Sequence, residues 1–193
     1  MLISNNSKKK ILLASGSPRR QQFFRELGLS FEIRLKEIDE SYPDNLKREE
    51  IAIYISEKKA GAFNDLDQDE ILVTSDTIVW LENVALGKPV NKEDAFEMLK
   101  RLSGKSHEVI TAFTIKSKDK KLSDFSITKV NFKDLSDEEI EFYIENYQPY
   151  DKAGAYGIQE WIGLIGIDKI EGSYFNVVGL PVNKLYKRLL EFY

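Results

Sequence analysis

A chain of 193 residues with 42% hydrophobic and 31% charged residues can fill a core and stay soluble, which excludes a disordered, collagen-like or membrane-spanning protein. Its length lies below the size at which hydrophobic cores divide, so we expect one domain over residues 1–193, built as two lobes. Residues 1–36 hold eight Lys or Arg against two Glu, whereas the whole chain has a net charge of −4. A long polyanion would be repelled by most of this surface, so the charge disfavours nucleic acid and favours a small phosphorylated ligand with a metal ion.

The N-terminal segment predicts a buried strand followed at once by a helix. Ile11 to Ala14 is an apolar run that is too short for a signal-peptide core or a membrane span, and Lys8 to Lys10 precede it. Together with the absence of cysteine, which excludes disulfides and thiolate zinc sites, this favours a cytoplasmic protein with no membrane partner. Ser17 is placed to cap the helix with its side chain, and Gly28 to end it.

Alternation and helical spacing predict the remaining elements. Ile71–Ser75 is expected to be a strand that ends at Asp76. The other predicted strands are Phe31–Leu35, Thr77–Glu82 paired with Val84–Leu86, His107–Lys116 paired with Leu122–Lys133, and a strand near Leu164–Ile170. The predicted helices are Lys47–Phe63, Lys92–Leu102 capped by Asn91, Asp137–Asn146 opened by a capping box, and a last helix from Pro181 to Phe192. Early alternation of strands and helices followed by paired strands indicates a mixed sheet in an α/β or α+β fold.

The turn after the first strand has the features of an anion site. Backbone N–H groups at a helix start carry partial positive charge, and Ser15 and Ser17 add hydroxyls. Arg19 and Arg20 stand in the first turn, where acidic residues are electrostatically preferred, so a bound anion would stabilise them. The alternative is that both arginines are solvated surface groups.

Carboxylates indicate a second component. Asp76 is expected at the carboxyl end of a strand, where α/β folds place ligands, and it could bind a metal or take a proton from water. Glu37 to Glu40 bring three carboxylates into four residues, and Mg²⁺ needs only one or two. The alternatives are a turn aspartate that caps local N–H groups and an ordinary acidic loop.

Lys88 lies between Gly87 and Pro89 and could neutralise a phosphate, although a loop lysine is the more frequent case. His107 is the only histidine, so it cannot form a multi-histidine metal site and is interpreted as a structural residue. The chain contains no G-x-x-x-x-G-K-[ST] and no G-x-G-x-x-G, which disfavours a Walker-type NTPase and a dinucleotide-binding Rossmann protein.

In their order and wording, these segments resemble the Maf family of nucleoside triphosphate pyrophosphatases, also called septum formation inhibitors. The matching blocks are Leu13-Ala14-Ser15-Gly16-Ser17-Pro18-Arg19-Arg20, Glu37-Ile38-Asp39-Glu40, Lys59-Ala60, Ser75-Asp76-Thr77-Ile78-Val79, Gly87-Lys88-Pro89, Leu102-Ser103-Gly104 with His107, Asp151 to Gln159, and Gly172-Ser173-Tyr174 through Gly179-Leu180-Pro181. The resemblance covers nearly the whole chain. It implies a mixed α/β fold similar to that of the inosine triphosphate pyrophosphatases, with a twisted sheet, flanking helices and two lobes around a cleft.

The resemblance also implies hydrolysis of dTTP and UTP to the monophosphate and pyrophosphate, and it assigns roles to residues. Asp76 is the expected catalytic base and, with Glu40, the expected ligand of Mg²⁺ or Mn²⁺. The residues expected to bind the substrate are Ser15, Arg20, Lys59 and Lys88, with Lys58 left open as an alternative to Lys59. Those expected to select the base are Arg19, Thr77 and Gln159, which match the dTTP/UTP branch.

The chain departs from the family pattern at Glu160, where the family usually has Gly, and at Tyr147 to Tyr150, where a glycine often stands ahead of the Asp151 block. Family members are often dimers, so a homodimer is an expectation. The alternative function is a regulator of cell division that binds nucleotide or nucleic acid without turnover.

Overall fold

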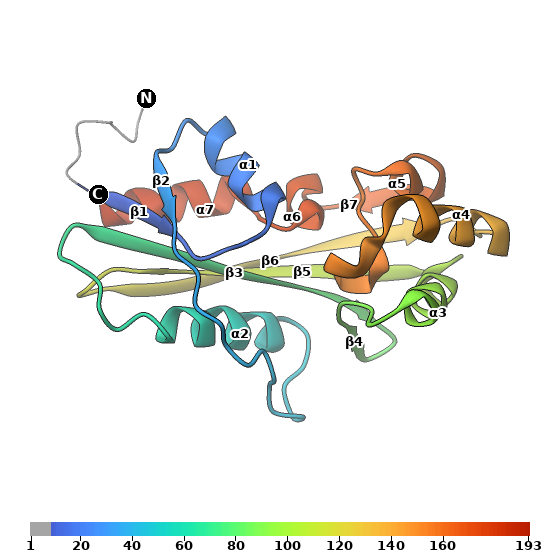
Figure 1. The fold of residues 1–193 in the computed structure, drawn as a ribbon, viewed down its shortest axis with the longest axis horizontal. Helices are drawn as coiled ribbons and strands as arrows, with labels where there is room; N and C mark the ends of the chain where they lie inside the picture. The colour runs from blue at the N-terminus through green and yellow to red at the C-terminus, as the bar shows by residue number, and fades with distance from the viewer. Residues whose placement is uncertain (1–8) are drawn as a thin grey trace. The chain divides into compact units, whose positions relative to one another are not determined.

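The computed structural model describes residues 9–193, so Lys8 of the basic segment lies outside the described residues. Strands and helices alternate along the chain (Figure 1). The strands are β1 (Lys10–Leu13), β2 (Phe31–Ile33), β3 (Glu70–Leu81), β4 (Val84–Leu86), β5 (Ser106–Lys116), β6 (Lys121–Phe132) and β7 (Ile167–Glu171). The α-helices are α1 (Pro18–Glu26), α2 (Glu49–Gly61), α3 (Lys92–Leu102), α4 (Asp137–Tyr147), α5 (Trp161–Gly166), α6 (Tyr174–Val178) and α7 (Val182–Leu189). In residues 9–193 no helix is long and apolar enough to cross a membrane.

The strands form one mixed sheet in the order β2-β1-β3-β5-β6-β7, with β4 paired to β3. β1 is parallel to both β2 and β3, and its register with β3 ends at the pair Leu13 and Val73. β4 is antiparallel to β3, and β7 is antiparallel to β6. The expected mixed α/β fold with flanking helices is therefore confirmed.

The chain divides into two compact units. Unit 1 comprises residues 1–76, 111–126 and 179–193, and unit 2 comprises residues 77–110 and 127–178. The boundary falls directly after Asp76, inside β3. A single domain over residues 1–193 stays a prediction.

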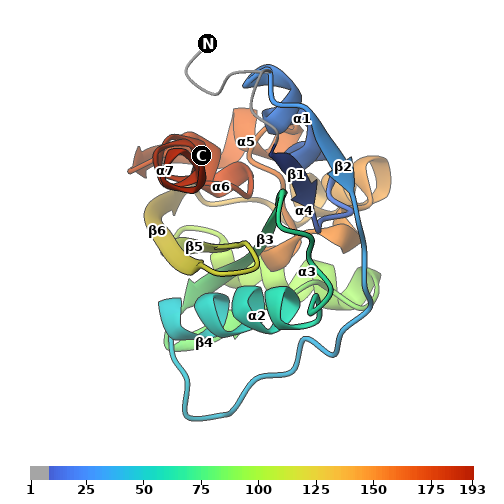
Figure 2. The same cartoon turned by 90° about the vertical axis from the view of Figure 1, so that its left-hand side faces the viewer.

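In unit 1 helices cover both faces of the sheet. α2 lies along one face, and α1 and α7 lie on the other (Figures 1 and 2). On the α2 side, buried Leu12 and Leu72 pack with Ala60, Phe63 and Leu66. Burial of these side chains fixes the rotation of α2 and thereby decides which of its polar residues face the sheet.

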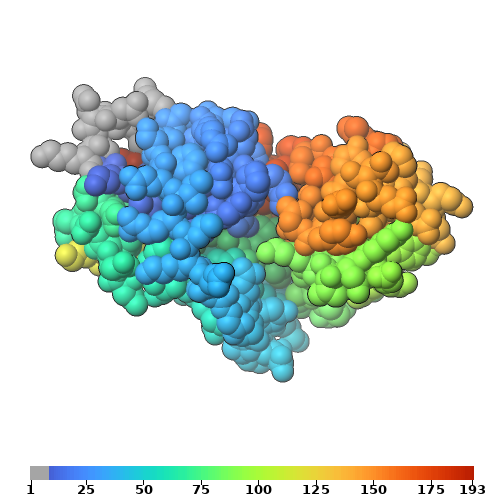
Figure 3. All heavy atoms as spheres, in the orientation of Figure 1, coloured from blue at the N-terminus to red at the C-terminus, as the bar shows by residue number. Residues whose placement is uncertain are grey.

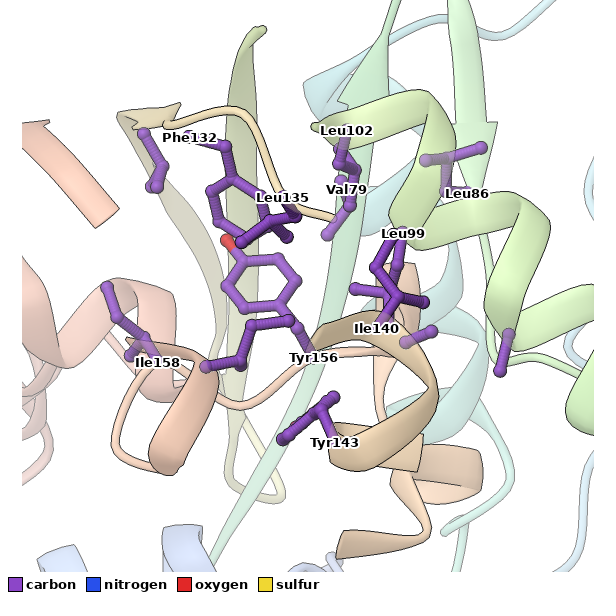
Figure 4. Packing of buried hydrophobic residues seen from close by; sticks show 14 of the residues in the cluster. Val79, Leu86, Leu99, Leu102, Phe132, Leu135, Ile140, Tyr143, Tyr156 and Ile158 are labelled. Carbon is purple, nitrogen blue, oxygen red and sulfur yellow. The ribbon is translucent and has the colours of Figure 1, made fainter. Parts of the chain in front are cut away.

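Unit 2 contains the larger apolar cluster, shown in Figure 4. Leu99 and Leu102 of α3 and Ile140 and Tyr143 of α4 pack against strand residues such as Val79. The predicted capping box of α4 is present, because the Ser136 hydroxyl accepts from Glu139 N and the Glu139 carboxylate accepts from Ser136 N. α4 is thus fixed at its start as well as along its buried face.

The structure corrects the predicted strand end at Asp76. β3 continues without a break to Leu81, and its end pairs with β4 in the predicted hairpin. Asp76 therefore lies inside a long strand. The reason is that the residues after Asp76 have high strand propensity and no turn residue interrupts them.

Two further expectations are wrong. Residues 164–166 belong to helix α5, and the strand begins only at Ile167. Ser17 does occupy the N-cap position of α1, but its side chain makes no capping hydrogen bond; instead Ser17 N donates to the Ser15 hydroxyl at 3.3 Å. The helix start therefore depends on Ser15 rather than on the side chain of Ser17.

His107 lies in the core of unit 2, as expected of a structural residue. It is 2% exposed, and its Nε2 lies 2.7 Å from the Tyr156 hydroxyl. Its Nδ1 is buried, and among the described residues it has no hydrogen-bond partner. Burial lowers the pKa of His107 to about 4, because a charged ring would lose its hydration.

We expect the free energy of unfolding to fall as the pH drops from about 6.5 to about 5. In this range the unfolded chain gains a proton at His107 and the folded chain does not, so the loss is about 1.5 kcal/mol. Urea unfolding at several pH values measures it. Because the chain has one histidine, His107→Gln is the matched control, and a wild-type loss no greater than that of the variant would contradict the expectation.

Candidate active site

The turn between β1 and α1 forms one wall of the candidate site. Ala14 N donates to Val73 O, which keeps the chain beside β3 just past the end of β1. Ser15 is buried, and its main-chain carbonyl accepts from the Gln21 side chain at 3.3 Å. Since β1 ends opposite Val73 and β3 continues, Asp76 emerges close to the start of α1.

Asp76 faces α2, as the alternation of β3 requires. Thr74, two residues earlier and on the same face of the strand, donates to Ser56 O of α2 at 2.7 Å. Lys59 follows Ser56 by three residues and so lies on the same side of the helix. Its Nζ reaches Asp76 Oδ1 at 2.7 Å.

The same lysine contacts a second carboxylate. Lys59 Nζ lies 2.9 Å from Glu40 Oε1, and the Lys59 side chain is only 16% exposed. Glu40 comes from the segment 34–48, which has no helix or strand. The atoms of this segment, light blue in Figure 3, form a protruding part of the surface. One ammonium group therefore joins a strand residue and a loop residue.

The neighbouring lysine points elsewhere. Lys58 Nζ pairs with Asp39 at 3.4 Å and donates to Ser41 O at 3.0 Å. Hydrogen bonds from Ser41 hold the pKa of the Asp39 carboxyl below its usual value. The structure therefore brings Lys59, and not Lys58, to Asp76.

Arg20 approaches from α1 and is held by main-chain oxygens. Its Nε donates to Gly179 O at 2.8 Å, and its Nη1 donates to Ser75 O at 2.9 Å. Burial lowers the pKa of the Arg20 guanidinium, with Arg19 acting in the same direction and Asp76 opposing. Arg20 is thus fixed beside the residue that precedes Asp76.

Asp76 is placed to accept a proton. It is 8% exposed, and burial raises the pKa of its carboxyl while Lys59 and Arg20 act in the opposite direction. A raised pKa makes a carboxylate a better base at neutral pH. Burial thus increases the basicity of the Asp76 carboxylate. A metal ion that acidified the water would favour the same proton transfer.

The carboxylates fit a divalent cation. Residues 9–193 contain no group of three or more His, Asp or Glu that could hold a metal. However, Glu40 and Asp76 already converge on one cation, the Lys59 ammonium, and two carboxylates are as many as Mg²⁺ normally takes from a protein. The oxygen donors present therefore suit a hard cation.

Three of the predicted site residues, Thr77, Lys88 and Gln159, belong to unit 2. Lys88 is exposed, and Gly154 N donates to Gly87 O at 2.9 Å, which joins its loop to the segment 151–159. A Cβ on Gly154 would lie 2.8 Å from Val79 Cγ2, so only glycine permits this approach. Gln159 is exposed and lines a hollow of about 400 Å³ with Leu164, Tyr174 and others.

Other functional groups were not foreseen. The carbonyls of Ser75 and Gly179 hold Arg20, and main-chain acceptors leave no residue-type signal in a sequence. A buried lysine, Lys152, pairs with Asp151 at 2.7 Å and with Glu160 at 3.1 Å. The departure from the family pattern at Glu160 was the available signal for that pair.

Comparison with solved structures supports the fold. The chain is similar to a HAM1 protein from Coxiella burnetii, with a TM-score of 0.51 and 14% identity over 95% of this chain and 99% of that chain. At this identity the similarity concerns the fold alone.

Sequence comparison is more specific. The chain is 59% identical to a dTTP/UTP pyrophosphatase of Flavobacterium johnsoniae and 58% identical to one of Flavobacterium psychrophilum, each over 98% of both chains. A dTTP/UTP pyrophosphatase of Phocaeicola vulgatus is 52% identical over 97% of this chain and 98% of its own length. The family model described as "Maf-like protein" matches residues 10–192, and the chain therefore belongs to the Maf family.

Proposed function

We propose that this protein hydrolyses dTTP and UTP to the nucleoside monophosphate and pyrophosphate. The observation that supports this proposal most directly is the buried Asp76 carboxylate, whose Oδ1 lies 2.7 Å from Lys59 Nζ. Beside it is the Arg20 guanidinium, which two main-chain carbonyls hold in place. A base and two cations in one place suit attack of water on a polyphosphate. The choice of dTTP and UTP as substrates is taken from the names of the relatives.

In the proposed reaction Asp76 accepts a proton from water, whose oxygen attacks the α phosphorus. The bond from that phosphorus to the bridging oxygen breaks, and pyrophosphate leaves with the electron pair. Arg20 and Lys59 stabilise the negative charge that develops on the phosphates, and we assign Ser15 and Lys88 to the same triphosphate.

Glu40 and Asp76 are the residues that would hold Mg²⁺ or Mn²⁺. When bound, such an ion neutralises phosphate charge and lowers the pKa of water. Lys59 already balances both carboxylates, so the chain itself keeps them close together without the ion.

We assign the choice of base to Arg19, Thr77 and Gln159. Their guanidinium, hydroxyl and amide groups offer donors and acceptors for the carbonyl and imide edges of thymine and uracil. Gln159 is exposed on a fixed loop, which suits contact with a ligand.

Product analysis over a panel of nucleotides tests the proposal. Incubation with dTTP or UTP and Mg²⁺ is expected to give monophosphate and pyrophosphate, with lower kcat/KM for CTP and the purine triphosphates. Release of orthophosphate would indicate a phosphatase instead. A clear preference for GTP would contradict the assignment of thymine and uracil as the preferred nucleobases.

The rival function, a binder without turnover, predicts a different result in the same assay. It requires nucleotide or DNA binding with no product, and DNA binding that weakens steeply with salt. The excess of basic residues in residues 1–36 is its best support. The relatives' names favour the enzyme.

A further inference from the structure

A polar network inside unit 2 includes Glu160, the residue that follows Gln159. Lys152 is 8% exposed and pairs with Glu160 at 3.1 Å. The other carboxylate oxygen of Glu160 accepts from the hydroxyl of Tyr143, a fully buried residue of α4. That hydroxyl in turn accepts from Gly157 N at 2.9 Å.

Backbone hydrogen bonds within residues 157–163 close this segment into a compact loop. Glu160 N donates to Gly157 O, and Gly163 N donates to Glu160 O, each at 2.9 Å. A Cβ on Gly163 would lie 1.8 Å from Ile158 O, so the helix start and the loop are in direct backbone contact. The backbone on both sides of Gln159 is therefore held by hydrogen bonds and packing.

The Gln159 side chain lies next to Glu160. A Cβ placed on Gly157 would be 2.9 Å from Glu160 Oε2 and 3.0 Å from Gln159 Nε2, so both side chains fold over the same glycine. The Glu160 carboxylate is held by an ion pair with Lys152 and a hydrogen bond from Tyr143, whereas Gln159 is exposed. A shift of Glu160 would therefore move the amide of Gln159.

We infer that Tyr143, Glu160 and Lys152 are positioning residues that fix Gln159 for discrimination among bases. The inference rests on the proposed function, in which Gln159 contacts the base. Glu160 replaces the glycine usual in the family pattern, so the chain supplies a charged support at this point. The burial of the lysine is consistent with such a support, because a buried ion pair that also accepts hydrogen bonds restricts the geometry of its neighbours.

The test uses Tyr143→Phe and Glu160→Gln in the full chain. Each is expected to raise KM for dTTP roughly tenfold and to lower the ratio of kcat/KM for dTTP over CTP by a similar factor, because one or two hydrogen bonds are lost. kcat for dTTP is expected to stay within about twofold, since Asp76 and Lys59 belong to unit 1 and are untouched. Tyr147→Phe is the matched control, because it removes the same hydroxyl group one helical turn later. The Tyr147 ring stacks on Tyr143, with ring centroids 5.2 Å apart.

Combination with Gln159→Ala separates positioning from simple structural support. If the network acts through Gln159, Tyr143→Phe is expected to change the dTTP/CTP ratio no further in the Gln159→Ala background. Additive changes in the ratio, or a lowered Tm with an unchanged ratio, would overturn the inference. If Gln159→Ala alone leaves the ratio unchanged, the role of Gln159 in the proposed function fails and the inference fails with it; an effect of Gln159→Ala without one of Tyr143→Phe and Glu160→Gln defeats only the inference.

Discussion

Replacement of Asp76 by asparagine is expected to lower kcat for dTTP by about 100-fold or more, the usual loss of a general base. The amide would keep the shape of the side chain but could not accept a proton from water. Nucleotide binding is expected to survive, because Arg20 stays held by Ser75 O and Gly179 O. Steady-state kinetics and calorimetric titration with dTTP measure the two quantities.

Unfolding of the Asp76→Asn variant is not expected to explain this loss. Burial raises the pKa of Asp76, so the ionised carboxylate is less stable in the folded protein than in the unfolded chain. The neutral amide should therefore give a Tm equal to or above that of the wild type. Asp39→Asn is the control, since Asp39 lies on the exposed pair with Lys58; normal turnover by Asp76→Asn would remove Asp76 from the mechanism.

Lys59→Met is expected to lower kcat/KM by about two orders of magnitude, comparable to the loss of one preorganised charge partner. The substitution removes the ammonium that Asp76 and Glu40 share. The two carboxylates would then repel each other and the incoming triphosphate. Kinetics with dTTP as the varied substrate measure the loss.

The adjacent lysine provides the control. Lys58→Met removes an ion pair with the exposed Asp39 and a hydrogen bond to Ser41 O, and neither contact involves Asp76, so kcat/KM is expected to stay within about twofold. A second readout is the acidic limb of the pH profile. Lys59 lowers the pKa of Asp76, so Lys59→Met should move that limb to higher pH. Equal losses in Lys58→Met and Lys59→Met would contradict the assignment.

Most of the fold could be predicted from local signals. Ser136 with Glu139 defined the start of α4, Asn91 that of α3, and both hairpins followed from alternating apolar residues around polar turns. α5 was missed because the sequence Trp161 to Gly166 is apolar, β-like and contains two glycines. In the structure the backbone of Gly163 lies against Ile158 O, where any side chain would clash, and periodicity alone does not reveal this contact.

The candidate site could be predicted only in part. Helix spacing placed Lys58 and Lys59 near one stripe but could not choose between them, since the choice depends on the rotation of α2 against β3. That rotation is set by contacts such as Thr74 with Ser56, which join residues 18 positions apart. The network of Tyr143, Lys152 and Glu160 depends in the same way on tertiary contacts.

The anchoring of Arg20 has a consequence for the protein during its synthesis. Its Nε is bound by Gly179 O, and residues 179–193 are the last segment of unit 1. While the ribosome still covers that segment, the guanidinium lacks one of its two main-chain anchors, although the sequence up to Asp76 has long emerged. In the nascent polypeptide Arg20 can therefore gain this second anchor only after residue 179 has left the ribosome, so the arginine is fixed late although its own helix is made early.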